Sequence, residues 1–261
     1  MMESSTSQPN ALPPAGAPSS TAYNHPLLQA RAAVQPGCKC QRLLWPRRIH
    51  ALLGLTFTLF LLLHLCIAAM GVDPSFYQRT VDWAEHLRRR LPGVELLFVF
   101  APFAAQAGIG LYLLWHEGMK YNVKKCNRGG KLRFFLQRVS ALVILAFVLF
   151  HVATMHRWGG GLFQPQGHAF ESTVLGLGLA TSAPMSLLLS AFTLLALLAT
   201  AFHAANGAWS GGIVWKLPGK TIREHLWAAL CVWIGLSLAL LGCIAFYAFT
   251  LSARAAAILA R

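Results

Sequence analysis

Long apolar stretches alternate with short polar segments along most of this chain. Five apolar stretches, at 47–70, 95–116, 134–156, 184–206 and 226–251, are each long enough to form a membrane span. An α-helix rises about 1.5 Å per residue and needs roughly 20 mainly apolar residues to cross a bilayer core of ~30 Å. The pattern therefore predicts an all-α, polytopic membrane bundle of five transmembrane helices, in one domain covering residues 45–254.

The segments outside the spans differ in character. Residues 1–44 are rich in Ser, Pro, Ala and Gln and show no helical periodicity, so we expect a disordered cytoplasmic tail without a signal peptide. The polar segment Tyr77–Arg90 has an apolar stripe, which predicts a short helix lying on the membrane surface. The connection 157–183 is rich in glycine, and we expect a loop there.

Composition and charge support a membrane protein and orient it. Only 11% of the residues are Asp, Glu, Lys or Arg, against about 25% in a soluble domain. The net charge of +14 would suggest nucleic-acid binding in a soluble protein, but here fifteen of the 22 Lys and Arg lie on the N-terminal side of the spans. The positive-inside rule then predicts a cytoplasmic N-terminus, an external C-terminus and no nucleic-acid partner. The basic connection 117–133 is either a docking face for an acidic partner or simply part of this topology signal.

Histidines inside the apolar stretches are the candidate functional residues. His64 and His151 lie 16 residues beyond Arg48 and 13 beyond Arg138, which places both rings in the outer half of the bilayer. A single histidine in a span is more often a hydrogen-bonded packing residue, but His203 makes a third on a third span. The spans lack carboxylates, which disfavours a proton relay, and titratable groups there are usually functional. We therefore predict that His64 and His151 hold a haem iron between two helices.

A haem also needs hydrogen-bond donors for its anionic propionates near the membrane surface. The inner ends of three spans offer side chains of this kind. The alternative is that the arginines are topology anchors and the tryptophan an interfacial residue. The candidate cofactor-binding residues are Arg47, Arg48, His50, Gln137, Arg138, Asn206 and Trp209.

Three motifs together resemble a known family. They are RRIHALLGLTFTLFLLLHL at 47–65, LQRVSALVILAFVLFHV at 136–152 and FHAANGAWS at 202–210. In these the chain resembles the five-helix cytochrome b membrane anchor of succinate dehydrogenases and fumarate reductases, in particular the Bacillus-type succinate:quinone oxidoreductase. The resemblance covers about residues 45–250.

The resemblance implies a function and its partners. It implies two b haems stacked across a bacterial cytoplasmic membrane, an FAD flavoprotein subunit and an iron–sulfur subunit on the cytoplasmic face, and quinone, here menaquinone, as membrane substrate. Such a subunit relays electrons and does not itself act on succinate. The family's outer-haem ligands map to His64 and His151, and its inner-haem ligand on span four maps to His203.

The chain departs from the family pattern at the inner haem. The family's span-two ligand stands in a Pro-x-x-x-His-x-x-x-Gly-x-Tyr pattern, whereas this chain has PFAAQAGIGLY at 102–112, with Gln106 in place of the histidine. At that position Gln106 is a further candidate cofactor-binding residue, although a neutral amide is a poor ligand for haem iron. His116 lies about 15 Å further along the helix and cannot replace it. The inner haem is then absent, five-coordinate through His203, or held by another second ligand such as His50.

Two other functions remain open from the sequence. One is a cytochrome b anchor of another quinone-linked dehydrogenase or hydrogenase, and the other is a haem-free structural anchor. The quinone site is not defined by any motif. Asp82, Glu85 and His86 of the outer surface helix are candidates for it, although the same residues also suit a solvated helix face.

Overall fold

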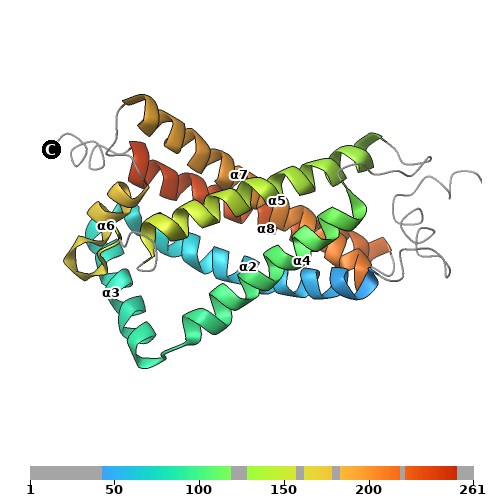
Figure 1. Ribbon diagram of the computed structural model, residues 1–261, viewed down its shortest axis with the longest axis horizontal. Helices are drawn as coiled ribbons and strands as arrows, with labels where there is room; N and C mark the ends of the chain where they lie inside the picture. Colours follow the sequence, from blue (N-terminus) through green and yellow to red (C-terminus); the bar gives the residue numbers. More distant parts are fainter. Residues whose placement is uncertain (1–42, 119–127, 157–161, 178–182, 218–220, 252–261) are drawn as a thin grey trace, which may run out of the picture. The chain divides into compact units, whose positions relative to one another are not determined.

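A computed structural model describes residues 43–118, 128–156, 162–177, 183–217 and 221–251 (Figure 1). These residues form helices and short connections, without a β-strand among them. The predicted tail at 1–44 lies almost entirely outside the described residues. Its last residue, Leu44, already belongs to the first described helix, which therefore begins slightly before the Trp45-Pro46 pair.

Five long helices form the bundle. They are α2 (Leu44–Ala69), α4 (Ala101–Glu117), α5 (Arg128–Met155), α7 (Ala183–Val214) and α8 (Thr221–Phe246). The turn η3 (Met70–Val72) extends α2, and the π-helical turns η4 (Leu96–Phe100) and η5 (Tyr247–Leu251) precede α4 and follow α8. Within the described residues, five segments are long and apolar enough to cross a membrane: Leu44–Val72, Leu96–Glu117, Leu132–Met155, Pro184–Val214 and Arg223–Leu251. The predicted all-α, five-span architecture is confirmed.

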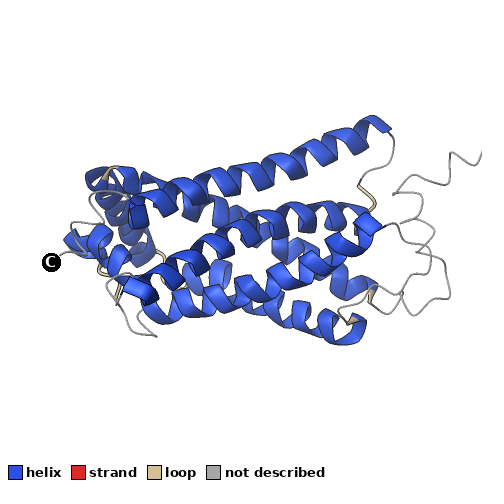
Figure 2. Ribbon diagram, turned by 90° about the horizontal axis from the view of Figure 1, so that it is seen from above, coloured by secondary structure: helices blue, strands red, loops and turns tan. Residues whose placement is uncertain are grey.

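The helices pack around α2 and α7. Helix α7 lies against α8, α5 and α2, while α2 also contacts α8 and α4 (Figure 1). Figure 2 shows the long helices running alongside one another. Large apolar side chains on every span remain exposed, as at Leu59, Leu111, Leu149, Leu187 and Leu240. Such an apolar exterior is unfavourable in water and suits the hydrocarbon core of a bilayer.

The first connection contains the predicted surface helix. Helix α3 runs over Pro74–Arg90, and its N-terminus is capped by Asp73, whose Oδ1 accepts hydrogen bonds from the backbone N–H groups of Ser75 (3.0 Å) and Phe76 (3.3 Å). A proline at the first helical position needs no N–H partner and favours this start. The prediction of a helix over 77–90 is confirmed, and it begins three residues earlier.

The second outer connection is not the simple loop that we expected. Helix α6 covers Pro165–Gly176, with a non-helical break at Gln166–His168 where Gly167 has φ +79°. Beyond the break, small residues allow close packing on α3 and η5, and Ala169 and Val174 are fully buried. Tertiary burial, rather than local helix propensity, therefore accounts for α6.

An apolar cluster holds α3, α6 and η5 together at the end of the bundle opposite Leu44 and Glu117. We call this cluster the outer cap and the opposite end the inner end, after the predicted orientation. The ring of Phe249 lies 5.2 Å from the rings of both Tyr77 and Phe170, measured between centroids. The Tyr77 hydroxyl and the Thr173 hydroxyl are 3.1 Å apart and satisfy each other within this buried cluster. The cluster comprises Tyr77, Val81, Ala169, Phe170, Val174, Leu177, Ala248 and Phe249.

Candidate functional site

The two histidines singled out in the outer half lie together. The ring of His64 on α2 and the ring of His151 on α5 have centroids 6.0 Å apart and planes at 77°. Phe60 stacks on His64 at 5.6 Å and 25°, and Phe147 stacks on His151 at 5.8 Å and 17°. Each imidazole is thus held by a phenyl ring one turn earlier on its own helix.

One buried nitrogen of this pair has no hydrogen-bond partner in the part of the chain that the structure describes. Nδ1 of His151 is buried and lacks a hydrogen-bond partner within the described part of the chain. A substantial part of the His64 ring is accessible, although it lies in the middle of an apolar span. An unpaired imidazole nitrogen in such surroundings costs free energy unless a ligand uses it.

The spacing of the pair suits a metal held by two imidazoles. A first-row metal lies about 2 Å from an imidazole nitrogen, so an ion between two rings leaves their centroids about 6 Å apart. Among the described residues, no three or more His, Cys, Asp or Glu side chains gather as a metal site would need. A pair of protein ligands is enough when a porphyrin supplies the remaining four, and His64 and His151 therefore fit a haem.

His203 lies at the inner end, in a hydrogen-bonded network of its own. Its Nδ1 is 3.1 Å from the backbone oxygen of Gln137 and 3.1 Å from Oγ of Ser140, while its Nε2 is 3.4 Å from the Gln137 amide nitrogen. The Asn206 amide donates to Oε1 of Gln137 at 2.7 Å, and the Arg133 guanidinium donates to Oδ1 of Asn206 at 2.6 and 2.9 Å. Of the predicted propionate donors, Gln137 contacts His203 and Asn206 contacts Gln137, and a propionate role for either stays a prediction.

His50 and Gln106 meet beside this network. Their Nε2 atoms are 3.3 Å apart, so Gln106 of α4 contacts the His50 ring on α2. Nδ1 of His50 and Oε1 of Gln106 are both buried without a hydrogen-bond partner in the described chain. His50 also lies within electrostatic reach of His203. The structure therefore gathers three of the predicted cofactor residues, His50, Gln106 and His203, in one region.

A carboxylate that the sequence analysis did not single out binds two of the predicted propionate donors. Oε1 of Glu117, at the end of α4, accepts from the Arg47 guanidinium at 2.7 and 3.0 Å, and its Oε2 accepts from Arg138 at 2.6 Å. The side chain of Glu117 is only 16% exposed, so this ion triad is largely shielded. Glu117 could have been identified from the sequence, because it ends one span at the side of the membrane where arginines begin two others.

The remaining predicted donors take two different positions. The Arg48 guanidinium carbon lies 5.5 Å from the Trp45 ring centroid and 5.2 Å from that of Trp215, as a cation–π contact requires. Trp209 lies under the Arg133 guanidinium at 5.9 Å and so joins the His203 network. Nε of Arg48 and Nε of Arg138 are buried donors without a partner among the described residues.

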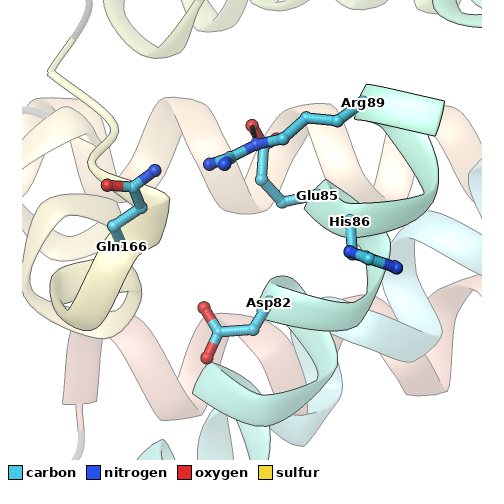
Figure 3. Close-up of a pocket in the computed structure, with 5 residues that line it drawn as sticks. All are labelled: Asp82, Glu85, His86, Arg89 and Gln166. Atoms are coloured by element: carbon cyan, nitrogen blue, oxygen red, sulfur yellow. Dashed lines mark hydrogen bonds and ion pairs between the residues drawn. The ribbon is translucent and has the colours of Figure 1, made fainter.

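At the outer surface, the three residues considered for quinone share a pocket. Asp82, Glu85 and His86 line a cavity of about 170 Å³ with Arg89 and Gln166. Figure 3 shows Asp82, Glu85 and Arg89 on the side of α3 that faces Gln166, whereas the His86 side chain is directed away from it. The Asp82 carboxylate already accepts a hydrogen bond from Gln78 at 2.9 Å.

The charged side chains around this pocket are joined in ion pairs. Glu85 accepts from Arg88 at 2.6 and 2.7 Å and from Arg89 at 3.3 Å. The hydrogen bond from Arg88 is the main reason that the pKa of the Glu85 carboxyl lies below its usual value, with Arg89 contributing and partial burial opposing. Glu95 lies 4.0 Å from Arg88 and 3.4 Å from Nε2 of His156, which links α3 to the end of α5.

Comparison with known proteins supports the resemblance seen in the sequence. No family model matches the chain, and no solved structure matches it. A search of curated proteins finds the succinate dehydrogenase cytochrome b558 subunit of Bacillus subtilis (strain 168), which is 26% identical over 210 residues, or 78% of this chain and 95% of that protein. The predicted resemblance to the Bacillus-type cytochrome b membrane anchor is therefore confirmed.

Proposed function

We propose that this chain is the cytochrome b membrane subunit of a succinate:quinone or quinol:fumarate oxidoreductase. It relays electrons through b-type haem between a docked iron–sulfur subunit and quinone in the membrane. The observation that carries the proposal is the pair His64 and His151, whose ring centroids lie 6.0 Å apart, with the buried Nδ1 of His151 lacking a hydrogen-bond partner within the described chain. The similarity to a succinate dehydrogenase subunit over most of both chains supports the assignment of the complex.

His64 and His151 would be the axial ligands of the outer haem. The bound haem supplies one-electron transfer, and two protein ligands leave no open position for oxygen. Phe60 and Phe147 keep the two imidazole planes in place by stacking. The surrounding apolar side chains exclude water, which keeps the site at low dielectric.

The inner end supplies positive charge for haem propionates. Arg47 and Arg138 are paired with Glu117, so the three groups together retain one positive charge. Nε of Arg48 and Nε of Arg138 are buried donors still available, and charge-assisted hydrogen bonds to a carboxylate would satisfy them. These two arginines are the strongest propionate candidates of the predicted set.

The proposed orientation follows the distribution of Lys and Arg. The N-terminus faces the cytoplasm and the C-terminus the outside of a bacterial cytoplasmic membrane. The flavoprotein with its FAD and the iron–sulfur subunit would dock on the basic cytoplasmic side, and menaquinone would react within the membrane. Succinate chemistry then belongs to the partner subunits, and this chain contributes electron transfer and quinone binding.

Purification of the intact complex from membranes tests the assignment. We expect a flavin-containing partner, iron–sulfur clusters, and a b-haem α band that succinate reduces. A partner containing nickel or molybdenum would instead indicate a hydrogenase or another quinone-linked dehydrogenase. A complex with flavin but without the α band would make the chain a haem-free anchor.

A further inference from the structure

His50 is an imidazole that the family pattern leaves without a role, and it lies toward the same end of the bundle as His203. Arg47 on α2 and Arg138 on α5 both bind Glu117, which brings the inner ends of the two helices together. His50 lies one turn beyond Arg47, and Ser140, which contacts His203, lies two residues beyond Arg138. His50 and His203 therefore both lie close to this ion triad.

Both rings show the division of roles expected of a ligating imidazole. A metal-bound histidine places one ring nitrogen on an orienting group and the other on the metal. In His203, Nδ1 lies on the Gln137 carbonyl at 3.1 Å, which leaves Nε2 with only a long 3.4 Å contact to the Gln137 amide. In His50, Nε2 lies on the Gln106 amide at 3.3 Å, and Nδ1 is buried without a partner among the described residues.

Glycines leave room for the side chains that meet here. A Cβ atom at Gly110 of α4 would come within 3.1 Å of Cε1 of His50, and one at Gly54 of α2 within 2.9 Å of Nε2 of Gln106. Any larger residue at these positions would push His50 or Gln106 out of its present place. The close approach of α2 and α4 is thus centred on this pair.

We propose that His50 of α2 is the second axial ligand, opposite His203 of α7, of an inner haem, and that Gln106 of α4 is a positioning residue for His50. An imidazole nitrogen is a strong ligand for haem iron, whereas a neutral amide is a poor one. The inference rests on the proposed function, because it requires that the chain binds haem. It changes which helices hold the inner haem: α2 and α7 replace the family's pair of spans two and four.

The test compares haem content and spin state in the purified complex of wild type, His50→Ala and Gln106→Ala. We expect two low-spin haems per wild-type chain by pyridine haemochrome assay and electron paramagnetic resonance. In His50→Ala, about half of the low-spin haem should be lost or become high-spin and CO-binding, and added imidazole should restore the low-spin form. Gln106→Ala should retain both haems but shift the low-spin electron paramagnetic resonance signal of the inner one, because the His50 ring loses the group that orients it.

Two further variants keep the test decisive. His116→Ala is the matched control, because His116 also lies at the inner end but its Nδ1 is 3.0 Å from the Tyr112 carbonyl of its own helix, and we expect unchanged haem. His50→Met retains a side chain able to ligate haem iron, so it should keep a low-spin inner haem with a raised midpoint potential. A structural role of His50 would leave that potential unchanged.

The outcomes separate the inference from the proposed function. The role of His50 would be overturned if the wild type contains haem and His50→Ala keeps all of its low-spin haem. Loss of low-spin haem in Gln106→Ala but not in His50→Ala would overturn it too. A single haem per wild-type chain would overturn it as well, while leaving the outer haem and the proposed function in place. Wild type without any haem would remove both.

Discussion

The inner end of the bundle and the outer cap are held together in different ways. At the inner end, α2, α4 and α5 are joined by the ion triad of Arg47, Glu117 and Arg138, and α5 and α7 by the hydrogen bonds around His203. The outer cap of α3, α6 and η5 is instead an apolar cluster with buried aromatic and aliphatic side chains.

The inner end and the outer cap are held together differently because their surroundings differ. Lipid chains are as apolar as leucine, so burying apolar side chains gives little driving force within the membrane, and polar contacts join spans. In the most apolar stretch of the second span, no residue is buried inside the molecule, whereas most of α6 beyond its break is buried. Helices α3 and α6 of the cap lie outside the spans, where the hydrophobic effect can stabilise their packing on η5 at the end of the last span.

Removal of the Glu117 charge should have the largest effect on stability. Glu117→Gln leaves Arg47 and Arg138 without their carboxylate, and we expect a loss of about 2 kcal/mol, below the usual cost of breaking a buried pair because Arg47 is 35% exposed. The thermal midpoint of the purified protein in detergent measures this. Glu171→Gln, on the exposed side of α6, is the control and should change little.

A substitution at Tyr77 tests the outer cap in the same comparison. Burial raises the pKa of the Tyr77 hydroxyl, which therefore stays protonated and bonded to Thr173 at neutral pH. Tyr77→Phe should cost about 1 kcal/mol, because the hydrogen bond between Tyr77 and Thr173 is lost, although the Thr173 hydroxyl still donates to the Ala169 carbonyl at 2.7 Å. Hydrogen exchange of α3 and α6 should accelerate while the inner ends of the spans stay protected. Thr173→Val should cost less in the Tyr77→Phe protein than in the wild type, where it leaves the Tyr77 hydroxyl without this partner, and equal costs in the two backgrounds would contradict this explanation.

The smallest expected effect concerns acid pH at the outer surface. The pKa of Glu85 is lower in the folded protein than its usual 4.5, so its ion pairs stabilise the cap fully above about pH 4.5. This contribution is lost as the pH falls through the lowered pKa, because the carboxyl then gains a proton that the unfolded chain already holds. Glu85→Gln should cost less than about 1 kcal/mol at neutral pH and should abolish this part of the acid dependence of α3 exchange.

A Glu85→Gln protein whose cap still loosens over the same acid range would show that another group titrates there. Glu171→Gln again serves as the control, since Glu171 is 48% exposed and pairs only with His168 at 3.4 Å among the contacts found.

The sequence predicts depth along the helices better than it predicts neighbours. Because helices rise regularly, the positions of His64 and His151 could be matched by counting from Arg48 and Arg138, and their rings do meet. Counting along an axis does not say which faces of different helices meet. The pairing of Glu117 with two arginines, and the contact of Gln106 with His50, depend on that rotation and could not be predicted.

Helix α6 shows a second limit. Its sequence contains Gly167 and small polar residues, which have low intrinsic helix preference. Its residues beyond the break are buried against α3 and η5, so packing that the local sequence does not encode stabilises the helix. Gln137 and Asn206 illustrate the same point, since the contact of Gln137 with His203 and that of Asn206 with Gln137 could not be predicted from their place along the helices.

The most direct test of the central claim is the low-spin haem content of purified complexes with His64→Leu, with His151→Leu and with both. His156→Gln, five residues further along α5, is the matched control and should retain all the haem. If the two rings share one iron, each single variant loses the same haem and the double variant loses no more than either. Full low-spin haem in either single variant, or losses that add in the double variant, would contradict the account.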